Sequence, residues 1–196
     1  MKDYILEVCV DSVESALAAE RGGATRLELC ANLVIGGTTP GYPLFEQVKK
    51  ETGLPVRTLI RPRFGDFLYT QYEHRQMLQD IRHFAQAGAD GVVIGSLNAD
   101  GTLNTEQIQE MMEAAGSCAV TMHCAFDVCA DPFEALKKSA ELGVDTILTS
   151  GQEADCLAGC GLLKKLVQLT DQSRSDSRRV TILAGAGVTS ANIAEI

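Results

Sequence analysis

Short apolar runs alternate with longer segments of mixed polarity along the chain. The runs are rich in Val, Ile and Leu, which favours buried strands, and many of the segments between them end at Gly, as helices do. This repeated order of strand and helix predicts an α/β protein with a parallel sheet. We expect strands at about 4–10, 27–30, 55–61, 91–95, 119–124, 146–150 and 180–184, helices at about 12–21, 43–52, 71–87, 104–116, 132–142 and 154–171, a polar turn at 171–177 and a last helix from Ser190.

The polarity of the strand ends favours one of two parallel-sheet architectures. A doubly wound sheet buries both faces of its central strands in apolar contacts, but polar residues recur here on the expected inward face: Glu7, Glu28, Arg61 and His123. A barrel can place such residues around its mouth, at the carboxyl ends of the strands. We therefore predict a single domain over residues 1–196. It is a TIM-type (β/α) barrel that is short at its C-terminus and lacks its eighth strand, since complete barrels take about 200 residues or more.

A four-residue phrase occurs twice, as Leu6-Glu7-Val8-Cys9 and as Leu27-Glu28-Leu29-Cys30. Side chains alternate along a strand, so each glutamate shares a face with the cysteine that follows it, at equivalent positions on adjacent strands. Thiolates are preferred ligands of Cu(I), so Cys9 and Cys30 could hold that ion; alternatively, both are small core residues. The chain has seven cysteines, an odd number, and no C-x-x-C pair, which predicts reduced thiols rather than a disulfide framework.

The loop after the third expected strand is rich in charge. It carries Arg61, Arg63 and Asp66 within the stretch Ile60 to Phe67. A guanidinium group presents a planar set of donors that suits carboxylate and phosphate, so the loop could bind a small anion at the mouth of the barrel. Alternatively, Arg61 neutralises the two interior carboxylates, which are unfavourable without partners. Both interpretations stay open at this point.

His123 ends the fifth expected strand, and Asp127 follows shortly after it. A histidine can act as a general base or a metal ligand, and a nearby carboxylate can orient its ring. A single buried histidine is also common for purely structural reasons. Together with Glu7 and Glu28, these two residues are the candidate acids and bases of a catalytic site.

Composition narrows the classes of partner. The chain has 196 residues, a formal net charge of −9 and 45% hydrophobic residues, as expected for a globular protein. Acidic and basic residues are intermixed and no basic run exceeds Arg178-Arg179, so we expect neither a nucleic acid nor a membrane as partner. Met1-Lys2-Asp3 leads directly into the first expected strand, which predicts no signal peptide and a cytoplasmic protein.

Several longer phrases resemble the CutC copper homeostasis family. They are LEVCVDSVESALAAERGGATRLELC, GGTTP, IRPRFGDFLY, GADGVVIG, AFDVCADP and LTSG, and they are spread over most of the chain. The resemblance implies a TIM-like barrel, a cytoplasmic homodimer or higher homo-oligomer, and a role in copper tolerance or trafficking, with Cys9 and Cys30 as the proposed Cu(I) ligands. One departure is Cys124 after His123, where relatives usually have arginine.

Two functions are therefore weighed. The first is a copper homeostasis protein that binds Cu(I) through the two thiols. The alternative is a barrel enzyme of unassigned reaction that acts on a small anionic molecule, with Arg61 and Arg63 as the anion clamp and Glu7, Glu28 or His123 as acid or base.

Overall fold

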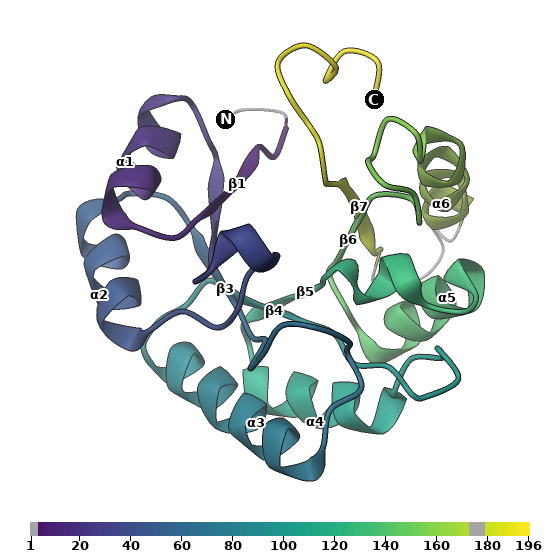
Figure 1. Ribbon diagram of the computed structural model, residues 1–196, viewed down its shortest axis with the longest axis horizontal. Coiled ribbons are helices and arrows are strands. Elements are labelled where there is room, and N and C mark those ends of the chain that lie inside the picture. Colours follow the sequence, from purple (N-terminus) through teal and green to yellow (C-terminus); the bar gives the residue numbers. More distant parts are fainter. Residues whose placement is uncertain (1–3, 173–178) are drawn as a thin grey trace. The chain divides into compact units, whose positions relative to one another are not determined.

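Seven parallel strands alternate with helices, as the polarity pattern predicts (Figure 1). The computed structural model describes residues 4–172 and 179–196; Met1 to Asp3, Arg178 and most of the expected polar turn lie outside the described residues. The α/β class and the TIM-type order of strands and helices are confirmed, with seven strands and no eighth among the described residues. The strands are β1 (Glu7–Val10), β2 (Arg26–Leu29), β3 (Val56–Leu59), β4 (Gly91–Ile94), β5 (Ala119–Met122), β6 (Thr146–Thr149) and β7 (Thr181–Ala184). The helices are α1 (Val13–Arg21), α2 (Tyr42–Glu51), α3 (Gln71–Gln86), α4 (Thr105–Ala115), α5 (Pro132–Leu142) and α6 (Cys160–Gln172), with 3-10 turns η1 (Leu33–Ile35) and η2 (Cys124–Val128).

The chain forms two compact units. The expectation of one domain over residues 1–196 stays a prediction. The first unit comprises Met1–Asp66, Thr70–Ile94 and Glu113–Ala119, and the second comprises Phe67–Tyr69, Gly95–Met112 and Val120–Ile196.

In the first unit, β1 to β4 pair in sequence order and α1, α2 and α3 lie on one side of them (Figure 1). Two helices begin at residues whose side chains cap them: Ser12 accepts from the backbone of Ser15, and Thr70 accepts from that of Glu73. The face of β2 that carries Leu27 and Leu29 is fully buried. This apolar face leaves the opposite face of the strands for polar side chains.

The register of the strands decides which polar residues meet. Cys9 of β1 is opposite Glu28 of β2, Glu28 is opposite Arg57 of β3, and Arg57 is opposite Gly91 of β4. The expectation that Cys9 and Cys30 hold equivalent positions is therefore wrong. The partner of Cys9 is Glu28, and Cys30 lies two residues after Glu28, just beyond the end of β2. Strand alternation still places both cysteines and Glu28 on the same face of the sheet.

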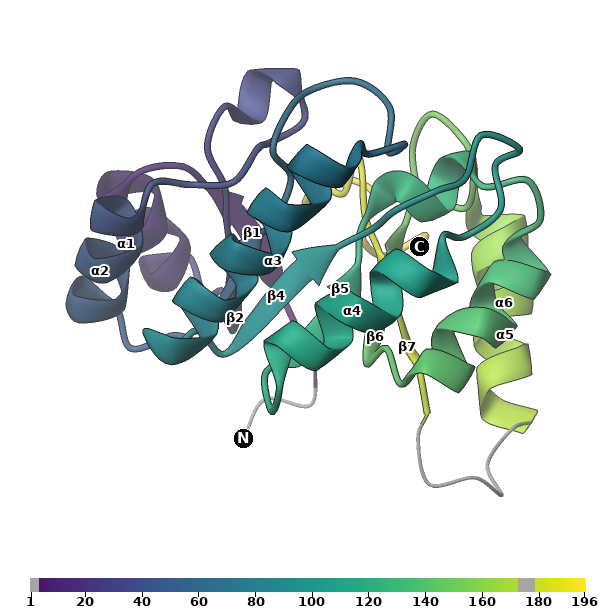
Figure 2. The same cartoon turned by 90° about the horizontal axis from the view of Figure 1, so that it is seen from below.

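In the second unit, β5, β6 and β7 pair in order, and α5 and α6 lie on the same side of β6 and β7 (Figure 2). Asp131 caps α5 by accepting from the N–H groups of Phe133 and Glu134, and Gly143 ends the helix in a left-handed conformation with φ of 85°. Among the described residues, no helix is both long enough and apolar enough to cross a membrane.

Helix α6 begins at Cys160 rather than near residue 154, because the loop before it folds back on the end of β6. Gly151 and Gln152 have φ of 76° and 60°. Gly159 packs so closely that a Cβ there would lie 1.8 Å from the carbonyl oxygen of Ser150. A regular helix cannot adopt this path, so the loop needs its two glycines.

The expectation of a last helix from Ser190 is also wrong, since residues 190–195 form turns. Asn192 Oδ1 accepts hydrogen bonds from the N–H of Thr189 at 2.7 Å and from its hydroxyl at 3.1 Å, and Asn192 Nδ2 donates to the carbonyl of Gly187 at 2.9 Å. Such local side-chain bonds compete with a regular helix.

Candidate functional site

The thiols of Cys9 and Cys30 lie together in the first unit. Cys30 directly follows β2, and its N–H donates to the carbonyl of Val10 at 2.9 Å, which continues the pairing with β1. A hydrogen bond with Cys9, together with burial, raises the pKa of the Cys30 thiol far above its usual range. The two cysteines differ in access, because Cys9 is exposed and Cys30 is 1% exposed.

Glu28 is the third member of this group. The Cys30 thiol donates to Glu28 Oε1 at 3.5 Å, and Glu28 Oε2 is buried with no hydrogen-bond partner among the described residues. Burial is the main cause that raises the pKa of Glu28 to about 7, with a further contribution from the charge of Glu7. The carboxyl group therefore keeps its proton to a higher pH than an ordinary glutamate does.

Two interior arginines oppose this rise, and sequence reasoning missed both. Arg26 and Arg57 each lower the pKa of Glu28 through their charge. Arg26 Nε also forms an ion pair with Glu7 Oε2, in which the two side chains are only 10% and 5% exposed. Strand alternation could have identified both arginines. It puts Arg26 on the same face as Glu28, and Arg57 on the same face as Arg61.

In the described structure, the side chains of Arg61 and Arg63 form hydrogen bonds with other groups of the same chain. Arg61 Nη1 donates to the carbonyls of Gly36 and Gly37 at 3.1 and 3.3 Å, and Nη2 donates to that of Gly65 at 2.9 Å. Arg63 pairs with Asp66 at 2.9 Å and with Glu73 at 2.5 Å. The proposed clamp of Arg61, Arg63 and Asp66 for an external anion stays a prediction, and these contacts give each residue a structural role beside it.

His123 and Asp127 lie in the second unit. His123 Nδ1 accepts from the N–H of Ala125 at 3.1 Å, and its ring is 4.9 Å from that of Phe67. A neutral imidazole that accepts at Nδ1 carries its proton on Nε2. In its neutral form His123 can therefore donate a hydrogen bond through Nε2.

The Asp127 side chain binds the loop that follows β6 through hydrogen bonds. Its Oδ1 accepts from the hydroxyl of Thr149 and from the N–H groups of Ser150 at 3.0 Å and Gln152 at 3.2 Å. The backbone donors of this loop, whose small residues resemble those of anion-binding turns, thus already bind a carboxylate of the chain itself.

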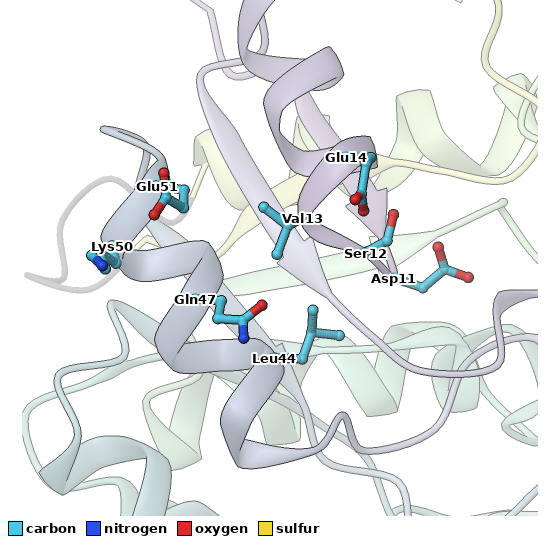
Figure 3. Close-up of a pocket in the computed structure, with 8 residues that line it drawn as sticks. All are labelled: Asp11, Ser12, Val13, Glu14, Leu44, Gln47, Lys50 and Glu51. Atoms are coloured by element: carbon cyan, nitrogen blue, oxygen red, sulfur yellow. The ribbon is translucent and has the colours of Figure 1, made fainter.

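A separate hollow of about 560 Å³ opens between the start of α1 and one side of α2 (Figure 3). Its walls carry acidic, amide and lysine side chains and two apolar ones, and neither Cys9 nor Cys30 is among them. The lining residues are Asp11, Ser12, Val13, Glu14, Leu44, Gln47, Lys50 and Glu51.

The donor set indicates which metal ions the structure can accept. Over the described parts of the chain, no group of three or more His, Cys, Asp or Glu side chains is arranged to hold a metal ion. Two adjacent thiols are sufficient for a soft ion of low coordination number, and Cu(I) is such an ion. The number and type of these donors therefore fit Cu(I) better than a hard ion or an ion that needs four ligands.

Comparison with known proteins places the chain in a family. The model of the CutC family matches residues 4–196. The chain belongs to the CutC family. The CutC protein of Bacteroides thetaiotaomicron is 49% identical over 197 residues, which cover 100% of this chain and 77% of that protein. The CutC protein of Salmonella typhimurium is 44% identical over 189 residues, 96% of this chain and 73% of that protein.

One solved structure agrees with the CutC family assignment. A protein from Streptococcus agalactiae, described as a proposed copper homeostasis protein CutC, superposes with a TM-score of 0.86 at 29% identity, covering 98% of this chain and 92% of that chain. Phosphoenolpyruvate phosphomutase from Streptomyces platensis superposes with a TM-score of 0.63 at 14% identity, covering 100% of this chain and 74% of that chain. This second likeness shows a shared fold alone.

Proposed function

We propose that this chain binds Cu(I) through Cys9 and Cys30 and takes part in copper tolerance or trafficking. The observation that carries the proposal is that register and strand alternation place the two thiols on one face of neighbouring strands, where Cys9 acts on the Cys30 thiol. It is supported by membership of a family in which the Streptococcus agalactiae protein is described as a proposed copper homeostasis protein.

The charges around the thiols suit a copper thiolate pair. Two thiolates and one Cu(I) carry a net negative charge, which is costly to bury without compensation. Arg26 and Arg57 act on Glu28 from the same face and supply positive charge there. Glu28, whose raised pKa favours its protonated form, adds less negative charge than an ordinary carboxylate and leaves the soft sulfur ligands to bind the ion.

Anaerobic competition against a chromophoric Cu(I) chelator tests the proposal. We expect the Cys9→Ser, Cys30→Ser double variant to lose more than about a hundredfold in Cu(I) affinity, since even residues that only orient ligands change affinity by 10–100-fold. The matched control is Cys124→Ser, Cys156→Ser, which also removes one exposed and one buried thiol. Equal affinities of the native chain and the Cys9, Cys30 variant would contradict the proposal.

A second candidate function is an enzyme that acts on a small anionic molecule. A carboxyl group with a pKa of about 7 is poised for acid–base chemistry, and Glu28 is such a group. In this function Glu7 is a further acid–base candidate and Arg61 and Arg63 hold the anion, whereas the acid–base role of His123 stays a prediction from the sequence. A thermal-shift screen of small carboxylates and phosphates separates the two functions, since an anion that stabilises the native chain but not an Arg63→Ala variant would favour the enzyme.

The remaining partner expectations stay predictions. They are a homodimer or higher homo-oligomer, a cytoplasmic location and the absence of nucleic-acid and membrane partners. Size-exclusion chromatography with light scattering measures the first of them directly.

A further inference from the structure

The backbone at Gly37 comes close to the buried thiol of the pair. Cys30 forms an apolar cluster with Leu59 and Val93, against which Leu33 packs. Gly37 lies next to this cluster. A Cβ added at Gly37 would be 2.8 Å from Leu59 Cδ2 and 3.6 Å from Cys30 Sγ. Gly37 also has φ of 85°, a conformation that other residues rarely adopt. The close approach to Cys30 therefore depends on glycine at this position.

The segment that carries Gly37 is held to the ends of β2 and β3. Ala31 and Thr38 exchange backbone hydrogen bonds of 2.9 and 2.8 Å. Thr39 donates its N–H to the carbonyl of Arg61 at 2.9 Å, and the N–H of Arg61 donates to Thr39 Oγ1 at 2.8 Å. These bonds hold Gly37 beside Cys30.

The Arg61 side chain completes this arrangement. Its guanidinium binds the Gly36 and Gly37 carbonyls through Nη1 and the Gly65 carbonyl through Nη2, so it connects the loops after β2 and β3. Arg61 is 6% exposed, and a buried guanidinium is stabilised by such carbonyl acceptors. All of these residues belong to the first unit.

We propose that Gly36 and Gly37 form a cap over the Cys30 thiol, and that Arg61 is the positioning residue that keeps this cap closed. A reagent or soft metal ion then meets the exposed Cys9 first and reaches Cys30 only when the cap opens. The extension to copper entry rests on the proposed function, whereas the cap itself does not. Arg61 thereby controls access to the thiol pair without touching the ion.

Metal-free alkylation by iodoacetamide, followed residue by residue with mass spectrometry, tests the cap. The sulfur of Cys30 forms a bond to carbon, iodide leaves and the thiol proton passes to the buffer. The measurements use a Cys9→Ser background, so that the neighbouring thiol is not modified first. We expect Arg61→Met to raise the Cys30 rate at least about tenfold, which is the change expected for a cap destabilised by a few hydrogen bonds. Arg61→Lys, which keeps a donor, should give a smaller increase.

Two comparisons separate cap opening from loss of fold. Cys156, which is buried in the second unit, should stay slow in every variant. Gly37→Ala keeps Arg61 but displaces the cap, because its Cβ would meet Leu59, and it should also accelerate Cys30. An unchanged Cys30 rate in Gly37→Ala overturns the proposal, whether or not Arg61→Met folds. Because no copper is present, this outcome is independent of the affinity measurement that tests the proposed function.

Discussion

Replacing Arg26 by methionine is expected to lower the free energy of unfolding by about 3–5 kcal/mol, the cost typical of removing one partner of a buried ion pair. The Glu7 carboxylate is 5% exposed and loses its partner, and Glu28 loses one of the two positive charges that act on it. Methionine preserves most of the apolar stem of arginine, so the lost stability reflects mainly the removal of the positive charge. Chemical denaturation at pH 7 measures it.

Two variants serve as controls for the Arg26 prediction. Adding Glu7→Gln to Arg26→Met removes the carboxylate that has lost its ion-pair partner. The double variant should therefore be more stable than Arg26→Met alone. Lys138→Met breaks an exposed pair with Glu141 on α5, where little change is expected. A loss in Arg26→Met as small as that in Lys138→Met would show that the pair with Glu7 contributes little.

Replacing Glu28 by glutamine is expected to change the pH dependence of stability. The pKa of Glu28 is about 7 in the folded chain, against an ordinary value of 4.5, so the folded state binds this proton more tightly than the unfolded state. Stability is therefore greatest below the ordinary pKa and falls as the pH rises towards 7. Between pH 5 and pH 8 the native chain should lose about 2–3 kcal/mol relative to Glu28→Gln.

Denaturation curves of both proteins at several pH values test the Glu28 prediction. The charged groups that act on Glu28 are Glu7, Arg26 and Arg57, and the Cys30 thiol donates to it; all are present in both proteins and largely cancel in the difference. A difference in stability that is constant from pH 5 to pH 8 would mean that Glu28 titrates as an ordinary carboxylate.

Most of the fold could be predicted from the sequence because strand and helix signals agreed locally. Ser12 caps the first helix and Gly143 ends the fifth, at the positions that their residue types favour. One error arose where a tertiary contact overrides the local pattern. Before α6, the chain folds back so that Gly159 packs on the carbonyl of Ser150, and nothing in the local sequence reveals that contact.

The candidate site was only partly predictable. Alternation placed Cys9, Cys30 and Glu28 on one face, which the register supports. Alternation also puts Arg26 on that face, but the partners of the arginines could not be predicted, because the sequence does not show the register in which the strands pair. That register sets Arg26 beside Glu7, whereas Arg61 turns to loop carbonyls. Burial was equally hidden, so the raised pKa of Glu28 emerges only from the folded chain.

X-ray absorption at the copper edge, on the native chain loaded anaerobically with one equivalent of Cu(I), tests the central claim most directly. The account predicts a first shell of sulfur alone, at the low coordination number that two thiolates provide. That shell should be lost in the Cys9→Ser, Cys30→Ser variant and kept in Cys124→Ser, Cys156→Ser. A shell of oxygen or nitrogen in the native chain, or a sulfur shell that survives loss of Cys9 and Cys30, would contradict it.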